Sequence, residues 1–289
     1  MSSVCQSPSA PATEPLTVEW IHGSESSKHN TDPDVQVYWF DENTAILRQN
    51  KAINYEAPFL YLLFGDRRAA LLDTGATASP ELFPLRRVVD ELVDSWLARH
   101  FVDDYSLVVT HTHSHDDHVA GDDQFVGRPD TVVIGADRDS AWKFFGFAAN
   151  DPEAIKVFDL GDRAIEVLAT PGHDGAAVTF YDPRTGFLLT GDTVYRGRLY
   201  VEDWQAFSDS IDRIIAFADQ RPVTYVMGCH IEMTRQPGVD YPVRTTFQPD
   251  EPPLEMTPDH LRAVRGALAT AGSNPERITC DDFIIWPES

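Results

Sequence analysis

Apolar residues in this chain fall into short runs bounded by polar and turn-forming residues. Continuous apolar runs of this length are typical of buried strands, and less regular apolar segments add further candidates. The pattern predicts strands over residues 16–20, 35–40, 44–48, 59–64, 69–72, 107–109, 131–134, 165–169, 176–181, 187–189, 223–227 and 283–286. Apolar residues at helical spacing predict helices over residues 79–97, 140–147, 204–218 and 257–271.

The order of these segments mixes hairpins with strand–helix units, which favours an α/β protein with a mixed sheet covered by helices. Residues 235–258 carry six prolines, which predicts a long loop there. Residues 1–15 are rich in Ser, Pro and Ala and predict a disordered lead. We find no linker in the remainder, so we expect a single domain over residues 16–289.

Charge and composition narrow the classes of partner. Acidic residues outnumber basic ones by 46 to 23, a formal net charge of −23, which argues against nucleic acid or an anionic membrane as partner. We find no apolar run that could span a bilayer and no signal-peptide pattern. Cys5, Cys229 and Cys280 are odd in number and widely spaced. They predict free thiols in a reducing, cytoplasmic compartment.

The strongest chemical signal follows the predicted strand at residues 107–109. Four histidines and two aspartates lie within eight residues there. Because residues two apart in an extended segment face the same side, His113 and His115 can bind one cation. Asp117 and His118 follow where the chain turns, and can reach a second cation. Imidazoles with a carboxylate suit zinc, with iron, manganese and nickel as alternatives. A polar loop without metal is disfavoured, because crowding these groups costs desolvation and repulsion.

Three more residues that can bind metal each follow a predicted strand. His173 comes after a Thr-Pro-Gly turn, Asp192 after a Thr-Gly pair and His230 after a Gly-Cys pair. A His or Asp after a strand is commonplace, so each position alone is a weak signal. Together with the first cluster, the three positions predict one shared metal site.

These motifs resemble the metal-binding signature of the metallo-β-lactamase fold superfamily, over about residues 58–232. The resemblance implies an αββα sandwich, in which two mixed β-sheets pack face to face with helices outside and metals at one edge of the sheets. It also implies two ligand sets, namely His113, His115 and His173 for one metal, Asp117, His118 and His230 for the other, and a bridging Asp192.

The resemblance also suggests residues around the metals. Asp73, in an Asp-x-Gly turn, is expected to support the site by hydrogen bonds, and a turn or capping aspartate is the alternative. His111 and Asp116 are interpreted either as hydrogen-bond partners of the ligands or as surface groups. Cys229 could be a soft metal ligand, but we favour a buried thiol.

The implied activity is that of a binuclear zinc-dependent hydrolase, with iron or manganese as alternative metals. A hydroxide shared by two metal ions would attack a carbonyl, and Asp117 would orient that hydroxide. The expected partner is a small-molecule substrate, with thioesters ranked above lactones of the quorum-quenching type and β-lactams third. In lactonases of the superfamily a tyrosine at the offset of Tyr195 contacts the substrate carbonyl; packing beside the site is the alternative. Arg196 and Arg198 would hold a substrate carboxylate or neutralise nearby acids.

Two other classes stay open at this point. One is an iron-dependent oxidoreductase on the same fold, such as a persulfide dioxygenase, and the other is a non-catalytic protein that kept the fold. Mononuclear dioxygenases mainly use the first ligand set, so the presence of His118 and His230 favours two metals. An intact ligand set argues against a non-catalytic protein. A homodimer is one expected assembly, and the loop at residues 235–258 is expected to form part of the pocket wall because it follows His230.

Overall fold

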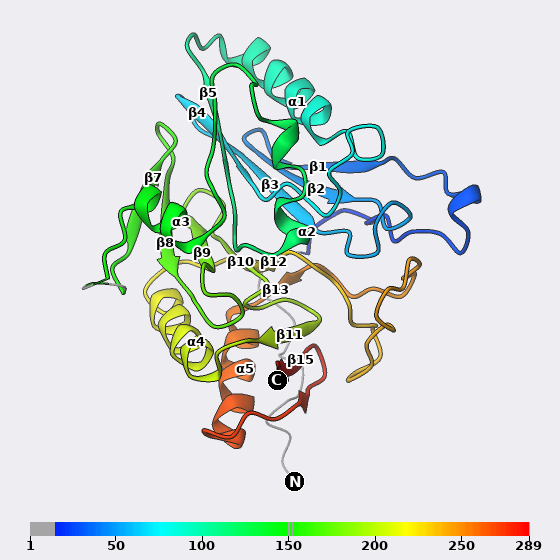
Figure 1. Cartoon of the computed structure of the whole chain (residues 1–289), viewed down its shortest axis with the longest axis vertical. Helices are drawn as coiled ribbons and strands as arrows, with labels where there is room; N and C mark the ends of the chain where they lie inside the picture. The colour runs from blue at the N-terminus through cyan, green and yellow to red at the C-terminus, as the bar shows by residue number, and fades with distance from the viewer. Residues whose placement is uncertain (1–14, 150, 152, 289) are drawn as a thin grey trace.

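The computed structural model describes residues 15–149, 151 and 153–288. The lead predicted over residues 1–15 therefore lies outside the described residues, apart from Pro15. Two six-stranded β-sheets pack face to face, and three further strands form a small third sheet (Figure 1). Helices cover the outer faces of the two large sheets, so the architecture is the predicted αββα sandwich.

The first large sheet is mixed. Its six strands lie in the order in which they occur in the chain. Neighbours among the first four strands are antiparallel, and the fifth and sixth strands run parallel to the fourth. The strands are β1 (Val35–Asp41), β2 (Thr44–Gln49), β3 (Phe59–Phe64), β4 (Arg68–Leu72), β5 (Ser106–Thr110) and β6 (Thr131–Val133).

The second large sheet is also mixed, in the order β13-β12-β10-β9-β8-β7. Only β10 and β12 run parallel within it, and the other neighbours are antiparallel. Its strands are β7 (Lys156–Asp159), β8 (Ala164–Ala169), β9 (Val178–Asp182), β10 (Phe187–Gly191), β12 (Tyr225–Gly228) and β13 (Glu255–Met256). The third sheet consists of β11 (Arg198–Val201), β14 (Ile278–Thr279) and β15 (Ile284–Pro287).

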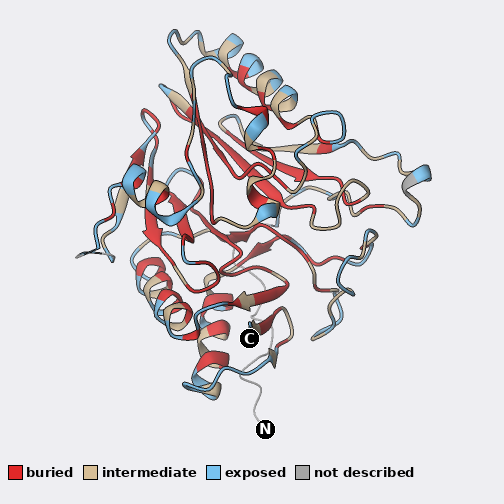
Figure 2. Cartoon of the chain, in the orientation of Figure 1, coloured by how far each residue is buried: buried red, intermediate tan, exposed pale blue. Residues whose placement is uncertain are grey.

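Strand β3 shows why the central strands are apolar throughout. Tyr61 and Leu63 point into the core between the two sheets, together with Phe180 of the second sheet. Leu60 and Leu62 point to the opposite face and join a second core beneath a helix. Because side chains alternate along a strand and both faces are covered, the whole run is buried (Figure 2).

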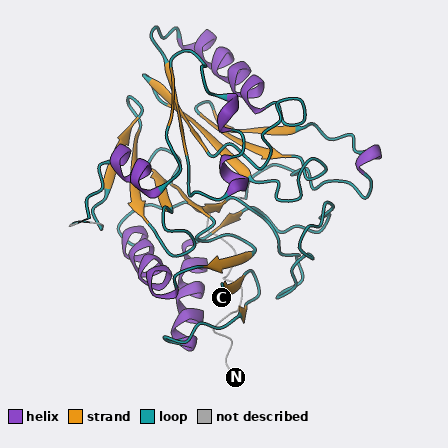
Figure 3. Cartoon of the chain, in the orientation of Figure 1, coloured by secondary structure: helices purple, strands orange, loops and turns teal. Residues whose placement is uncertain are grey.

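The helices form the outer layers. One helix packs on the first sheet, and the two longest of the others pack against each other on the second sheet. Figure 3 shows them outside the strands, with the loops gathered at the strand ends. The helices are α1 (Leu85–His100), α2 (Asp116–Val119), α3 (Arg138–Phe145), α4 (Trp204–Ala218) and α5 (Pro258–Ala271), and two short 3-10 turns are η1 (Ser27–His29) and η2 (Asp122–Gln124).

The structure differs from the predicted elements in three respects. The helix predicted from residue 79 begins at Leu85, because Pro84 inside a helix would clash with the preceding turn. Residues 16–20 form no strand, and instead the Ile21 amide donates to the Gln36 side chain. The apolar pattern also does not predict β7, β11, β13 and β14, because β7, β11 and β13 carry charged residues and β14 has only two residues.

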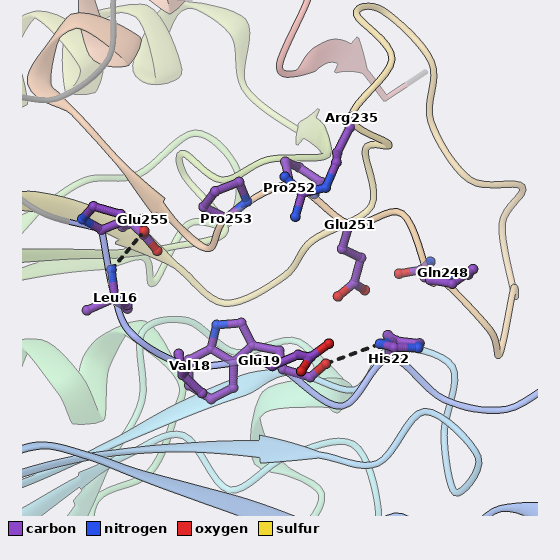
Figure 4. A pocket seen from close by; sticks show the side chains of 13 residues that line it. Leu16, Val18, Glu19, His22, Arg235, Gln248, Glu251, Pro252, Pro253 and Glu255 are labelled. Carbon is purple, nitrogen blue, oxygen red and sulfur yellow. Dashed lines mark hydrogen bonds between the residues drawn. The ribbon is translucent and has the colours of Figure 1, made fainter.

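The proline-rich segment is a loop, as predicted, apart from the two residues of β13. Its residues Arg235 and Gln248 face the N-terminal segment across a cavity of about 290 Å³ (Figure 4). Glu251 in the same wall forms a bidentate ion pair with the buried Arg48, at 2.6 and 2.7 Å. No residue of the loop is among those that line the metal-centre cavity described below, so the expectation that the loop forms part of that wall is wrong. The Tyr241 amide of the loop does donate to the carbonyl of Glu232, which lines that cavity.

The cysteines differ from the prediction of free thiols. Cys229 is free and buried, whereas Cys280 is disulfide-bonded, and Cys5 lies outside the described residues. In the part of the chain that the structure describes, every helix is too short or too polar to cross a membrane.

Candidate metal centre

The predicted ligands sit on loops that leave the ends of four strands. His113 and His115 follow β5, and Asp117 and His118 lie in the first turn of α2, for which His115 is the N-cap. The other three residues follow β8, β10 and β12 and are His173, Asp192 and His230. Both large sheets therefore supply residues to one point.

The seven side chains form two groups, within each of which the ligand atoms lie within 4.8 Å of one another. The first group consists of His113, His115 and His173, and the second of Asp117, His118, Asp192 and His230. In the second group the two Nε2 atoms of His118 and His230 are 3.2 Å apart. The structure thus brings together all seven residues that the sequence predicts as ligands.

Asp192 connects the two groups. Its Oδ2 lies 3.5 Å from His230 Nε2 and 3.6 Å from His118 Nε2. The same oxygen is 4.0 Å from Nε2 of His173, which belongs to the first group. A carboxylate in this position can serve two cations at once, as the resemblance implies.

The donor atoms fit a metal. Nε2 of His113, Nε2 of His173 and Oδ1 of Asp192 are buried and have no hydrogen-bond partner among the described residues. Burying a polar atom without a partner costs free energy, so such atoms require an explanation. A cation bound by nitrogen and carboxylate oxygen would satisfy all three, and this donor set suits zinc, iron or manganese.

Hydrogen bonds fix the orientation of the imidazoles. His173 Nδ1 donates to the Tyr200 carbonyl at 2.8 Å, and His230 Nδ1 donates to the Glu56 carbonyl at 3.0 Å. A carbonyl oxygen only accepts, so each Nδ1 carries the hydrogen. Each Nε2 therefore presents a lone pair to the site when the ring is neutral, which is the form that binds metal.

The two groups differ in their electrostatics. Burial and the neighbouring imidazoles of His118 and His173 hold the pKa of His113 well below its usual value. Burial also lowers the pKa of His230, but Asp192 and Asp117 outweigh it and raise this pKa to about 9. His113 is therefore a neutral donor, and the second group attracts positive charge.

Asp73 lies behind the second group. It accepts hydrogen bonds from the Thr112 amide at 2.7 Å and the Thr112 hydroxyl at 2.8 Å. His118 Nδ1 is 3.0 Å from its Oδ2, an arrangement consistent with the supporting role that the resemblance implies. The Cys229 thiol donates to the same oxygen at 3.5 Å, and burial raises the pKa of this thiol, which favours a buried thiol over a ligand.

Two other predicted residues lie away from the ligand atoms. His111 is buried, and its Nε2 lies 2.8 Å from Asp122 Oδ1. The Thr74 hydroxyl donates to the same aspartate oxygen at 2.7 Å. Asp116 is exposed on α2. The interpretation of Asp116 as a surface group fits this geometry, and the buried His111 pairs with the half-buried Asp122 away from the ligand atoms.

The three residues predicted to contact the substrate, Tyr195, Arg196 and Arg198, form hydrogen bonds or ion pairs with other residues of the protein. The Tyr195 hydroxyl donates its single proton to the Arg198 carbonyl at 2.5 Å, with Glu232 Oε2 at 3.1 Å. Arg198 forms ion pairs with Glu232 at 2.6 Å and Asp240 at 2.7 Å, and Arg196 pairs with Asp282. This geometry favours the alternatives, in which Tyr195 packs beside the site with its hydroxyl hydrogen-bonded within the protein and both arginines neutralise nearby acids.

A cavity of about 150 Å³ opens onto the site. Besides ligand residues and Tyr195, it is lined by Glu56, Tyr200, Glu232 and Glu288. Sequence reasoning missed these four residues because they come from separate loops and strands and carry no shared spacing. Only Glu232, two residues after the candidate ligand His230, lies close in sequence to a predicted site residue.

Two mixed sheets between helices, with histidines and aspartates gathered at the strand ends, define an α/β protein with a metal-binding centre. Residues 56–230 match the sequence profile of the metallo-β-lactamase superfamily, and this chain belongs to that superfamily. The resemblance read from the sequence is thereby confirmed.

Relatives and a solved structure agree with this assignment. The chain is 29% identical over 172 residues to a hydroxyacylglutathione hydrolase of Nostoc punctiforme, a match that spans 56% of this chain and 60% of that relative. It is 26% identical over 237 residues to a hydroxyacylglutathione hydrolase of a Synechococcus strain, spanning 80% of this chain and 85% of the relative. A metallo-β-lactamase from Pontibacter korlensis has a TM-score of 0.52 at 17% identity, with 81% and 99% of the two chains covered, and shows the fold alone.

Proposed function

We propose that this protein is a binuclear zinc-dependent hydrolase that acts on the carbonyl of small-molecule thioesters. The observation that carries the proposal is the pair of ligand groups joined by Asp192 at the base of a cavity. The relatives are named hydroxyacylglutathione hydrolases; these names support the hydrolase class and are our reason for ranking thioesters first.

Two zinc ions, when bound, would lower the pKa of a water molecule to near neutrality and polarise a carbonyl oxygen. The chain's own residues hold and orient the reactants. Asp117 Oδ2 lies 3.2 Å from His230 Nε2 and 3.4 Å from His118 Nε2, and the carboxylate lines the cavity. One oxygen of Asp117 would bind a cation, and the other would orient the attacking water and accept its proton.

Thioesters rank above lactones for a further reason. The case for lactones depended on Tyr195 donating to the substrate carbonyl, and its hydroxyl proton is already donated to the Arg198 carbonyl. A thiolate is a good leaving group and requires less assistance from a general acid. Lactone hydrolysis remains the second expectation, and β-lactam hydrolysis the third.

The test is hydrolysis of a neutral thioester, S-acetyl-N-acetylcysteamine, by zinc-loaded protein with thiol release as the readout. Wild type should turn the substrate over, and Asp117→Asn should lower kcat at least about a hundredfold, the usual contribution of a positioned base. Circular dichroism should show that this variant keeps its fold.

Asp116→Asn is the matched control, because Asp116 is the adjacent residue and is exposed away from the cavity. Its rate should equal that of wild type. An unchanged rate in Asp117→Asn, or no thioester hydrolysis by wild type, would contradict the proposal.

A further inference from the structure

The cavity over the metal centre is lined by acids that are not metal-ligand candidates. These are Glu56, Glu232 and Glu288, and the residues lining the cavity include no lysine or arginine. His173 and Asp192, which line the same cavity, are buried and each present a polar atom without a partner. His173 Nε2 and Asp192 Oδ1 lie at the end of the cavity where the metals would bind and the reaction would occur. The glutamates give the rest of the lining a negative charge.

The three glutamates are not equally available. Both carboxylate oxygens of Glu232 already have partners within the protein: Oε1 pairs with the Arg198 side chain, and Oε2 accepts a hydrogen bond from the Arg198 amide at 2.7 Å. Glu56 is half-buried and Glu288 is exposed. Neither forms an ion pair with any residue that the structure describes. These two carboxylates are therefore the lining glutamates that are not held in ion pairs, and Tyr55 is a hydrogen-bond partner of the Glu56 carboxylate.

Aromatic rings complete the lining. Tyr200 lies on β11, half-buried, with its ring 5.7 Å from that of Trp286. The Tyr195 ring lies 5.6 Å from the His230 ring. Aromatic faces beside carboxylates attract ammonium groups, quaternary ones included. Apart from metals bound at the base of the cavity, no lysine or arginine is among the described residues that line it, so the lining glutamates disfavour a carboxylate or phosphate on the leaving group.

We propose that this cavity selects thioesters whose leaving group carries a positive charge, accepts neutral ones less well, and disfavours anionic ones. The inference rests on the proposed function and adds a charge preference to it. A glutathione thioester carries two carboxylates and one ammonium, so we expect the preference of this chain to differ from the substrate in its relatives' names. Glu56 and Glu288 are the residues that set the preference.

Three acetyl thioesters of similar size and different charge test the inference. They are acetylthiocholine with one positive charge, neutral S-acetyl-N-acetylcysteamine, and S-acetyl-3-mercaptopropionate with one negative charge. At pH 8 and low salt, kcat/KM should fall in that order by about tenfold for each unit of charge. Added salt should narrow the spread, because screening weakens attraction and repulsion alike. Equal values for the cationic and anionic thioesters would overturn the inference.

Variants assign the effect to the two residues. Glu56→Gln and Glu288→Gln should each lower the ratio of cationic to anionic kcat/KM about fivefold, and the double variant should lower it further. Glu91→Gln is the control with the same change in net charge, because Glu91 lies exposed on α1 on the first sheet. Its ratio should equal that of wild type. A ratio that stays constant in the double variant would overturn the assignment.

Binding of choline, measured by calorimetry, separates this inference from the proposed function. Choline has no thioester, so its binding requires no hydrolysis. Wild type should bind it, and Glu288→Gln should weaken binding several-fold. If neutral thioesters are not hydrolysed but choline binds in this way, the proposed function fails and the charge preference stands. If choline does not bind wild type, the charge preference fails.

Discussion

Asp73 shows how a residue that is not itself a predicted ligand can set the geometry of one. It adopts a φ of 67°, a conformation that non-glycine residues rarely adopt and that costs free energy. Hydrogen bonds from Thr112 hold it there, and its Oδ2 faces His118 Nδ1. We infer that this strain is the cost of fixing the His118 ring toward the site.

We expect Asp73→Asn to weaken binding of the second metal by about 10- to 100-fold, the usual effect of losing such a partner. The Asn oxygen can still accept from Thr112, but its amide would then face the His118 N–H group, and two donors cannot bond. Competition with a chromophoric zinc chelator measures this affinity, and the first metal should bind as in wild type.

Asp122→Asn serves as the control for that prediction. Asp122 also pairs with a buried histidine, His111, but neither residue belongs to the ligand groups. Its affinity for both metals should equal that of wild type. Equal losses in the two variants would mean that Asp73 acts only through general stability.

At the scale of elements, one side chain joins the two large sheets. Arg163, in the turn before β8, donates to Asp182 of β9 at 2.5 and 3.1 Å. It also donates to the Phe64 carbonyl at 3.1 Å and to the Thr44 hydroxyl at 2.8 Å, both in the first sheet. Arg163 and Asp182 are almost fully buried. Water therefore cannot stabilise either charge, and each charge is neutralised by the other.

Arg163→Met should therefore lower the free energy of unfolding by about 3–5 kcal/mol, because it leaves the Asp182 carboxylate buried without its partner. Urea denaturation measures this loss. Arg184→Met is the matched control: Arg184 pairs at 3.7 Å with Asp162, whose side chain is 79% exposed. It should cost less than about 1 kcal/mol. Similar losses in both variants would show that the link between the sheets contributes little.

Elements with a clear periodic pattern were predictable from the sequence. The limits of α4 and α5 agree with the apolar spacing and with the Thr257 cap. The start of α1 was not, because Pro84 outweighed an apolar spacing that begins earlier. Strand β7 was not predictable because it lies at the edge of the sheet, where Val157 is exposed, and two of its four residues, Lys156 and Asp159, are charged. The spacing of apolar residues therefore predicts buried helices and strands better than strands at the edge of a sheet.

At the scale of the whole molecule, the ligand set was predictable and the cavity was not. His113, His115, Asp117 and His118 are close in sequence, so their spacing alone indicates a shared site. Glu56 and Glu288 are separated by most of the chain and meet only when both large sheets and the third sheet are in place. The commitment of the Tyr195 hydroxyl to the Arg198 carbonyl is likewise a property of the folded chain.

The central claim is that two metals bind, one in each ligand group, and the number of metal ions per chain tests it most directly. Elemental analysis of dialysed protein should find about two zinc ions in wild type. It should find about one each in His113→Ala and His230→Ala, which remove a donor from different groups, with the circular dichroism of all three proteins alike. A single metal in wild type, or iron in place of zinc together with no hydrolysis, would contradict the account.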